Sequence, residues 1–587
     1  MRILTTAFIL FPFLVFSQLK KEYYDNEQTH LKSETDYYRG MPHGPHYEYY
    51  KNGKVARKGY YYRGKEDSTW TFYFEDGGTK AVEHFVRGKK NGQNIYYYKN
   101  GKIAQITKFK LVTKNNITFD VADSTWTSYY ENGKIKSKEN FENGKKEGDW
   151  VYYHDNGQIE SKGKFVNDKK EGDVSTYYSS GKPAALQHYC NGKPCGKWQE
   201  YYENGTNKFE KEYKDSTMYL WSMWDARGKQ VVKNGNGYIS ATYDSGYIRA
   251  LGRYKNGLQD SLWRFFHPNG ELDYEANYRE GILNGYYSSY YPNHLLKSEG
   301  GFINGKKNGL WKFYDQDGKP EMQGTLKDGL RDGGWIYFYN NGKKESEGNF
   351  ADDKQTGTWN YYYRTGEKWK QGDYQNGIKN GTWTTWFENG NKLQEGPYVN
   401  GKENGLWQSW WDNGTLKDQG TFTNGELTGL WEGWYMNGKS NYKGKYNDKG
   451  KKEGEWLYWY DKGTFREKCN YVNGIKHGEY ISYYERGGFI DTQGKYRKGH
   501  QNGTWNYYYE TGGIMKTQSF SEGHLDGKCV SYYPSNTIQS VTNYKVISEK
   551  RKGKRTVQSV ADGDWIFYDK NGKEISRITY SNGVREK

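Results

Sequence analysis

The chain has 587 residues, a formal net charge of +16 and a mean hydropathy of −1.16. Hydrophobic residues make up only 34% of it, yet aromatic residues make up 18%, with 61 Tyr and 22 Trp. Disordered chains are poor in aromatic residues, so this composition excludes general disorder. Together with 74 Gly it predicts many strands and tight turns, with aromatic faces in place of an aliphatic core.

The first 17 residues differ from the rest. Arg2 precedes an apolar run from Ile3 to Phe16, and the small residue Ser17 follows. This order predicts a signal peptide, residues 1–17, and export to the periplasm or the cell exterior. No later segment approaches about 18 apolar residues, so we expect no transmembrane segment in the mature chain. Residues 18–45 are expected to form an irregular N-terminal cap.

A repeat occupies residues 46–580. A Trp, or a residue in its place, precedes a turn Gly by seven residues at 22 register positions, mostly 24 residues apart. The register begins at His46 and ends with Val530 and Trp565. It is irregular near 107–124, 221–246 and 544–563, and residues 581–587 form a tail. No helical apolar periodicity with capping residues occurs within the repeats.

One repeat, "GTWTTWFENGNKLQEGPYVNGKEN" (381–404), indicates a β-hairpin. "TWTTWFE", rich in aromatic residues and Thr, indicates one strand, and "KLQEGPYV" indicates the return strand. Asn389-Gly390 between them predicts a two-residue turn, because both positions tolerate positive φ. The "NGKENG" segment that starts at Asn400 predicts a looser turn before the next Trp. The expected fold class is therefore all-β: an elongated, twisted antiparallel meander of about 22 β-hairpin repeats of 24 residues.

Two aromatic rows follow from the repeat. Taking the register residue as position 0, position 3 is also aromatic in nearly every unit. Alternation along a strand places positions 0 and 3 on opposite faces. Position 3 is Trp in four consecutive units, at Trp386, Trp410, Trp434 and Trp459. We expect these four to form an unbroken ladder, and they are the candidate residues for stacking on a ligand.

The repeat resembles a known family. The half-motif in "GPYVNGKENGLW" (396–407) and "GDYQNGIKNGTW" (372–383) resembles the MORN repeat. The extension in "WTSYYENGK" (126–134) resembles the bacterial MORN variant of YwqK-type antitoxin proteins. That resemblance implies an all-β repeat fold without catalytic residues, and neutralisation of a toxin by binding. "GTWNYYYETGG" (503–513) is similar, more faintly, to hairpins of choline- and glucan-binding wall proteins.

The sequence contains few residues in patterns typical of catalysis. No zincin motif, P-loop or G-x-S-x-G elbow occurs, so we expect no enzyme, no cofactor and no metal site. Cys190 and Cys195 flank a turn in "CNGKPC" and can close a short disulfide, whereas no His or Cys at metal spacing is found beside them. Cys469 and Cys529 are expected to lie too far apart to pair.

A basic cluster completes the candidate sites; it consists of Lys550, Arg551, Lys552, Lys554 and Arg555. It either contacts phosphate, lipid headgroups or an acidic partner, or is a solvated loop. The expected function is an exported, non-enzymatic scaffold that binds a protein partner or an envelope component. Toxin neutralisation and binding of a wall glycan through the tryptophans are the alternatives. Nucleic acid is not expected as a partner, because an exported protein seldom meets it.

Overall fold

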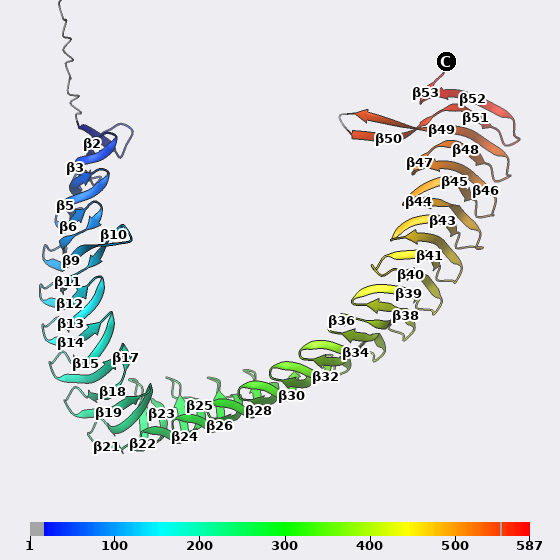
Figure 1. The fold of residues 1–587 in the computed structure, drawn as a ribbon. Coiled ribbons are helices and arrows are strands. Elements are labelled where there is room, and N and C mark those ends of the chain that lie inside the picture. The colour runs from blue at the N-terminus through cyan, green and yellow to red at the C-terminus, as the bar shows by residue number, and fades with distance from the viewer. Residues whose placement is uncertain (1–16, 552–553, 587) are drawn as a thin grey trace, which may run out of the picture. The chain divides into compact units, whose positions relative to one another are not determined.

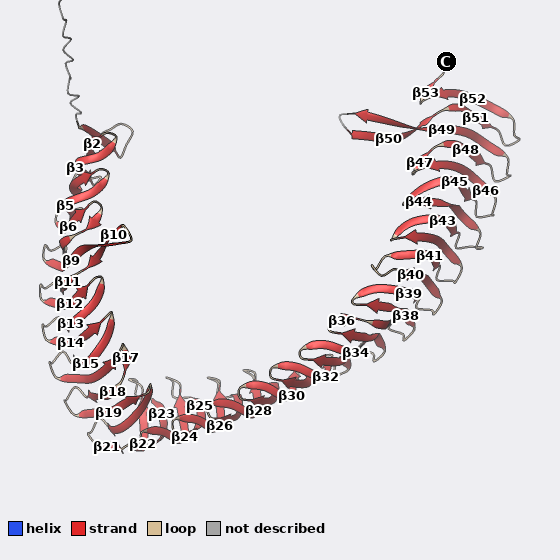
Figure 2. Ribbon diagram, in the orientation of Figure 1, coloured by secondary structure: helices blue, strands red, loops and turns tan. Residues whose placement is uncertain are grey.

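The computed structural model describes residues 17–551 and 554–586. All regular elements of these residues are strands, 53 in number, and none is a helix (Figure 2). The all-β prediction is thus confirmed, and the described part of the chain contains no helix long and apolar enough to cross a membrane. Apart from Ser17, the predicted signal peptide lies outside the described residues.

The chain divides into two units, which are Met1–Glu271 with Glu275–Ile282, and Leu272–Tyr274 with Leu283–Lys587. The strands of the first unit are β1 (Gln18–Tyr23), β2 (Leu31–Tyr38), β3 (Met41–Tyr49), β4 (Val55–Tyr62), β5 (Lys65–Tyr73), β6 (Thr79–Val86), β7 (Lys89–Lys90), β8 (Gly92–Tyr97), β9 (Ile103–Lys114), β10 (Ile117–Ala122), β11 (Ser124–Tyr129), β12 (Ile135–Glu142), β13 (Lys145–Tyr153), β14 (Ile159–Val166), β15 (Lys169–Tyr177), β16 (Pro183–Cys190), β17 (Lys193–Pro194), β18 (Gly196–Tyr201), β19 (Asn207–Lys214), β20 (Thr217–Trp224), β21 (Gln230–Lys233), β22 (Asn236–Thr242), β23 (Ile248–Lys255) and β24 (Leu258–Phe266).

Two strands, β25 (Leu272–Arg279) and β26 (Ile282–Tyr290), fall at the division between the units. The strands of the second unit are β27 (Leu296–Ile303), β28 (Lys306–Tyr314), β29 (Pro320–Lys327), β30 (Leu330–Phe338), β31 (Lys344–Ala351), β32 (Lys354–Tyr362), β33 (Lys368–Gln375), β34 (Ile378–Trp386), β35 (Lys392–Val399), β36 (Lys402–Glu403), β37 (Gly405–Trp410), β38 (Leu416–Thr423), β39 (Glu426–Trp434), β40 (Ser440–Tyr446), β41 (Lys452–Trp459), β42 (Phe465–Val472), β43 (Ile475–Tyr483), β44 (Ile490–Arg497), β45 (His500–Tyr508), β46 (Ile514–Ser521), β47 (His524–Leu525), β48 (Gly527–Tyr532), β49 (Ile538–Arg551), β50 (Lys554–Ala561), β51 (Gly563–Tyr568), β52 (Glu574–Ser581) and β53 (Val584–Arg585).

Within each unit, strands follow one another along the sheet in sequence order (Figure 1), and neighbours pair antiparallel. Strand β34 pairs with β33 on one side and with β35 on the other, with Trp383 opposite Gly396. Short strands such as β36 interrupt the alternation only at bulges. The predicted meander of hairpins is confirmed, because each 24-residue repeat supplies one hairpin and the next repeat continues the sheet.

The two turns of a repeat are the reverse of the prediction. Asn400 and Gly401 both have positive φ, 50° and 81°, and Val399 pairs with Lys402, so the turn expected to be loose is the tight two-residue one. At the other turn only Gly390 is left-handed, and the Phe387 N–H donates to the Asn391 carbonyl across a three-residue loop. The prediction of a two-residue turn at Asn389-Gly390 was wrong, because Asn389 instead accepts a hydrogen bond from the Asn391 N–H.

The segments expected to be irregular contain regular strands. Residues 18–45, expected as an irregular cap, hold β1, β2 and the start of β3, which pair like the later strands. The insertion near 107–124 lengthens β9, which pairs with β10 around a turn at Asn115 and Asn116. Likewise β49 and β50 form a long hairpin that extends beyond its neighbours in Figure 1. Near 221–246 the repeat is shortened, and β21 has only four residues.

The register tryptophans pack on glycines of the preceding strand. A Cβ atom added to Gly372 would lie 2.1 Å from Cδ2 of Trp383, so only glycine leaves room for the indole. Ten such pairs occur, with distances of 2.0–2.3 Å: Gly59/Trp70, Gly252/Trp263, Gly300/Trp311, Gly324/Trp335, Gly348/Trp359, Gly372/Trp383, Gly396/Trp407, Gly420/Trp431, Gly444/Trp456 and Gly494/Trp505. Trp383 is consequently only 3% exposed, although no second layer covers it.

Each buried indole is also fixed by polar and aromatic contacts. Trp383 Nε1 donates to the Asp373 carbonyl at 3.1 Å, so its only polar atom is satisfied. The ring meets Tyr374 edge-on, with centroids 5.1 Å apart and planes at 89°, and meets Tyr398 at 81°. Edge-to-face geometry suits the quadrupoles of the rings. The Gly-x-aromatic half of the motif therefore has three roles for one indole. Its glycine leaves room for the ring, its middle residue accepts the indole N–H through the backbone carbonyl, and its aromatic residue packs against the ring edge-on.

A second set of contacts links the three-residue loops of successive repeats. The Tyr363 hydroxyl donates to the Trp386 carbonyl at 2.8 Å, and the Asn389 amide donates to the Asp412 carbonyl at 2.8 Å. Equivalent bonds recur along both units, for example from Tyr130 to the Tyr153 carbonyl. Each loop is thereby tied to the loop one repeat further along the chain.

One register residue differs from the prediction. Cys529, not Val530, occupies position 0, since it pairs with Thr542 as Trp383 pairs with Gly396, and the Tyr509 hydroxyl reaches the Tyr532 carbonyl. In another repeat the residue beneath the ring is larger than glycine, and the ring is smaller than an indole. Cys469 stands at a glycine position, fully buried, and it pairs with a tyrosine, Tyr480, in place of a tryptophan.

The packing of indole on glycine predicts a site-specific loss of stability. Gly372→Ala is expected to lower the free energy of unfolding by about 1–3 kcal/mol, because the methyl group overlaps the Trp383 ring. Adding Trp383→Tyr should restore part of that loss, as at Cys469 and Tyr480. Urea unfolding followed by circular dichroism measures both effects. Gly334→Ala is the control, because its Cβ would meet nothing closer than 3.7 Å; equal losses at Gly372 and Gly334 would contradict the packing account.

Candidate binding faces

The tryptophan face is defined by the side chains at positions −4, 0, 2 and 15 of each repeat. Aromatic rings occupy positions 0 and 15 of most repeats and position 2 of about half of them, and several repeats place a cation at position −4. The Lys379 ammonium lies 4.4 Å from the Trp383 ring centroid, and Lys307 lies 4.1 Å from that of Trp311. Burial lowers the pKa of Lys307. These lysines lie over the rings. The face still has a hollow of about 490 Å³ in the second unit, lined by Arg331, Tyr337, Glu345, Ser346, Phe350, Asp353, Lys354, Gln355, Trp359, Tyr361 and Gly377.

The opposite face is defined by the side chains at positions 1, 3, 12 and 14. In the second unit it has two hollows of about 390 Å³ each. One is lined by Leu310, Gln323, Gly324, Gly334, Trp335, Ile336, Glu347, Gly348, Asn349, Thr358 and Asn360. The other is lined by Tyr286, Glu299, Gly300, Gly301, Leu310 and Lys312. Leu310 lines both hollows. Lys312 of the second hollow and Ile336 of the first are both at position 1, so the two hollows lie one repeat apart.

Free amide groups distinguish the first hollow. In the part of the chain that the structure describes, no hydrogen bond engages the side-chain amides of Gln323, Asn349 and Asn360. Two neighbours are already paired: Thr358 donates to Asp373 at 2.6 Å, and Glu347 accepts from Tyr362 at 2.6 Å. An amide offers donors and acceptors together. The hollow can therefore bind a ligand rich in amide or hydroxyl groups, with its geometry held by the paired neighbours.

The four predicted tryptophans lie in one row of the opposite face, each half-buried. They do not form an unbroken ladder, because a residue of the return strand lies opposite each ring. Trp386 pairs with Lys392, whose ammonium lies 5.3 Å from the Trp410 ring centroid, and Trp459 stacks on Phe465 at 5.2 Å. The backbone carbonyl of Trp434 accepts the indole N–H of Trp411, so the row also serves the links between loops.

Four residues of the basic cluster lie at strand ends of the β49–β50 hairpin: Lys550 and Arg551 end β49, and Lys554 and Arg555 begin β50. Lys552 falls outside the described residues, as do the side chains of Lys550, Arg551, Lys554 and Arg555. Their role as a contact for an acidic partner remains a prediction from sequence.

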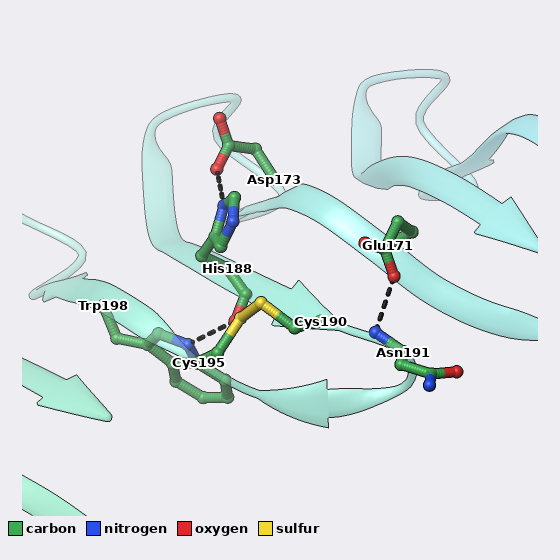
Figure 3. The surroundings of a disulfide bond; sticks show 7 residues. All are labelled: Glu171, Asp173, His188, Cys190, Asn191, Cys195 and Trp198. Atoms are coloured by element: carbon green, nitrogen blue, oxygen red, sulfur yellow. Dashed lines mark hydrogen bonds and ion pairs between the residues drawn. A yellow bond between two sulfur atoms is a disulfide. The ribbon is translucent and has the colours of Figure 1, made fainter. Parts of the chain in front are cut away.

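A disulfide joins Cys190 and Cys195, whose Cα atoms are 5.8 Å apart (Figure 3). The turn at Asn191 and Gly192 brings them together, and the Asn191 N–H donates to Glu171 Oε2 at 2.6 Å. Sequence reasoning missed His188, two residues before Cys190. Its Nδ1 lies 2.7 Å from Asp173 Oδ1, and its ligand atom lies within 4.8 Å of both sulfur atoms.

The other two cysteines form no disulfide. Cys469 and Cys529 are free and buried. Burial raises the pKa of Cys469 to about 11 and also raises the pKa of Cys529. Both thiols therefore stay protonated and unreactive at neutral pH.

Twelve segments match the sequence profile described as the MORN repeat variant, at residues 42–61, 90–111, 122–143, 146–167, 170–191, 194–215, 259–280, 307–328, 331–352, 379–400, 403–424 and 525–545. They occur in both units and coincide with the hairpins. No curated protein sequence matches the chain.

Solved structures similar to the chain include the TcdB2-TccC3 crystal structure and the Photorhabdus luminescens Tc holotoxin pore with a TccC3 mutation. Each is 10% identical over 97% of this chain, with a TM-score of 0.13. The chain spans about a third of the length of these proteins, 34% and 33% respectively.

The cysteine environments predict a defined thiol count. Without reduction, the native chain should react negligibly with a thiol reagent at pH 8, because the raised pKa values keep Cys469 and Cys529 as thiols. Denaturation should expose two thiols per chain, and denaturation with reduction should expose four. Colorimetric titration with a disulfide reagent measures these counts. Four thiols in the denatured, unreduced chain would contradict the Cys190–Cys195 bond.

Proposed function

The chain is a MORN repeat variant protein, and from that premise we propose that it is a non-enzymatic scaffold that binds an extended partner along its opposite face. The partner is a protein segment or an envelope polymer, and the predicted signal peptide supports its encounter outside the cytoplasm. The observation that carries the proposal is the set of free amides at Gln323, Asn349 and Asn360 in a hollow whose other groups are paired.

The difference between the faces supports this choice. In the hollow of the tryptophan face the Arg331 guanidinium is already paired, because it donates to Asp353 and to the Tyr337 hydroxyl. On the opposite face successive hollows share a lining residue, so a ligand that lies across one reaches the next. An extended polymer gains from such repetition, because each repeat adds contacts without a new site. Toxin neutralisation, implied by the resemblance to YwqK-type antitoxins, would be the same binding with a toxin as partner.

A wall glycan is the second candidate. The observation that favours it is the tryptophan row on the same face as the free amides, since sugars combine apolar ring faces with hydroxyl groups. Register residues one repeat apart are separated by two strand spacings, about 10 Å. That spacing is close to the length of a β-linked disaccharide, so equivalent sugars would meet equivalent side chains.

Loss of the free amides is expected to weaken capture of the partner. The triple variant Gln323→Ala, Asn349→Ala, Asn360→Ala removes three hydrogen-bonding groups, each worth about 1 kcal/mol, so affinity should fall by about tenfold or more. The full chain is immobilised, exposed to native envelope extract, and the captured species are quantified by mass spectrometry. Gln394→Ala, an exposed glutamine at position 11, is the matched control. Equal capture by the triple variant and wild type would refute the proposed face.

The tryptophan row gives a separate prediction for the glycan candidate. Trp386→Ala with Trp410→Ala should weaken binding of soluble β-glucan and peptidoglycan fragments by about tenfold or more, since each stacking ring contributes roughly 1 kcal/mol. Calorimetric titration measures binding, and circular dichroism checks that the sheet persists. Tyr153→Ala with Tyr177→Ala changes the same position in the first unit and should leave binding intact. Unchanged binding in the tryptophan variant, or no binding by wild type, excludes the glycan.

A further inference from the structure

We propose that His188, Cys190 and Cys195 form a Zn²⁺ site when the Cys190–Cys195 disulfide is reduced. The site is independent of the binding face proposed above, and it gives this repeat two exclusive states, one closed by a disulfide and one by a metal. In the described part of the chain this is the one group of three or more His, Cys, Asp or Glu side chains whose ligand atoms come close enough to share an ion.

Backbone register brings the three ligands together. His188 and Cys190 are two residues apart on β16, so their side chains leave the same face of the strand. The Cys195 N–H donates to the His188 carbonyl at 3.0 Å, which places Cys195 across from His188. The three ligand atoms consequently lie within 4.8 Å of one another before any metal is bound. Only a local separation of the two sulfur atoms is needed for both to ligate one ion.

Asp173 orients the histidine. It lies directly opposite His188 in the pairing of β15 with β16, and its carboxylate meets Nδ1 at 2.7 Å. Donation from Nδ1–H to a carboxylate leaves the lone pair on Nε2, the nitrogen that can then bind a metal. Carboxylate–histidine–metal arrangements of this kind are the usual support of zinc ligands. Figure 3 shows His188 between Asp173 and the disulfide.

A dithiol can act as the reductant that opens the Cys190–Cys195 disulfide. The dithiol transfers two electrons and two protons to the Cys190–Cys195 bond, and itself becomes a cyclic disulfide. Two protein thiols result. Zn²⁺ then displaces one proton from each thiol, so that two thiolates and the neutral His188 imidazole bind it and two protons are released.

The ligand set fits zinc. Two thiolates and one imidazole are the sulfur and nitrogen donors that Zn²⁺ prefers, and three protein ligands leave a fourth position for water. Carboxylate-preferring ions such as Mg²⁺ and Ca²⁺ are disfavoured by the same donors. Exchange with a small disulfide, such as the cyclic disulfide formed above, reverses the state. The two thiolates give two electrons to that disulfide and form the Cys190–Cys195 bond, the disulfide takes up two protons to become a dithiol, and Zn²⁺ is released.

Cobalt(II) is the spectroscopic probe for this site. The full chain is reduced with dithiothreitol, desalted without air, and titrated with Co²⁺. One equivalent should bind with a thiolate-to-cobalt charge-transfer band, which one equivalent of Zn²⁺ should abolish. The oxidised chain should show no such band. A reduced chain without the band would overturn the proposal.

Variants separate this site from other thiols. His188→Ala and Asp173→Ala should each weaken Co²⁺ binding by about tenfold or more, since loss of an orienting partner commonly costs 10–100-fold. Cys469→Ser with Cys529→Ser, which removes the buried thiols, should leave the band unchanged. Circular dichroism checks that each variant retains its sheet. A band that persists at full affinity in His188→Ala, or that disappears in the Cys469/Cys529 variant, would overturn the assignment.

Discussion

The structure depends on one interaction, an indole ring lying on a glycine of the preceding strand. A single-layer sheet has no second layer to bury its side chains, so each repeat must obtain burial from its neighbours. Trp311 and Trp359 are almost completely buried in this way. The pairing explains why an aromatic-rich, strongly polar sequence folds: the large rings supply the buried apolar area, and glycine supplies the space. It also explains why aliphatic residues are dispensable.

The different roles of the two faces follow from that interaction. Because the indoles occupy one face, other rings and cations of the chain pack around them there. The residues that alternate with them point the other way, where nothing requires them to be apolar. Gln323, Asn349 and Asn360 lie at these alternate positions, and the surface that is available to a partner is thus a by-product of how the sheet is stabilised.

The period, the strands and the alternation of faces could be predicted from sequence, because Trp, Gly and Asn-Gly recur at fixed spacing. Details that depend on pairing could not. Asn-Gly occurs at both turns, yet it forms a two-residue turn at Asn400 and part of a three-residue loop at Asn389. Val530 was placed one residue out of register because Cys529 lacks the aromatic ring that marks position 0. The four tryptophans were correctly placed in one row, but the alignment of Lys392 beside Trp386 depends on the bulge between Thr385 and Trp386. His188 joins the cysteines only through the β16–β17 turn, which spacing along the chain does not reveal.

The two kinds of turn give the sheet two unequal margins. At the three-residue loops, tyrosine and asparagine side chains tie each repeat to the next, so a change of length there would break links on both sides. At the two-residue turns the repeats are linked mainly through the backbone, as where the Gly401 N–H donates to the Lys379 carbonyl of the preceding repeat at 2.9 Å. Both long insertions, the β9–β10 and β49–β50 hairpins, occur at this second margin. The array can therefore gain new arms by lengthening a turn on one margin while the opposite margin preserves the repeat distance. The same margin is the natural place to graft a foreign peptide for display.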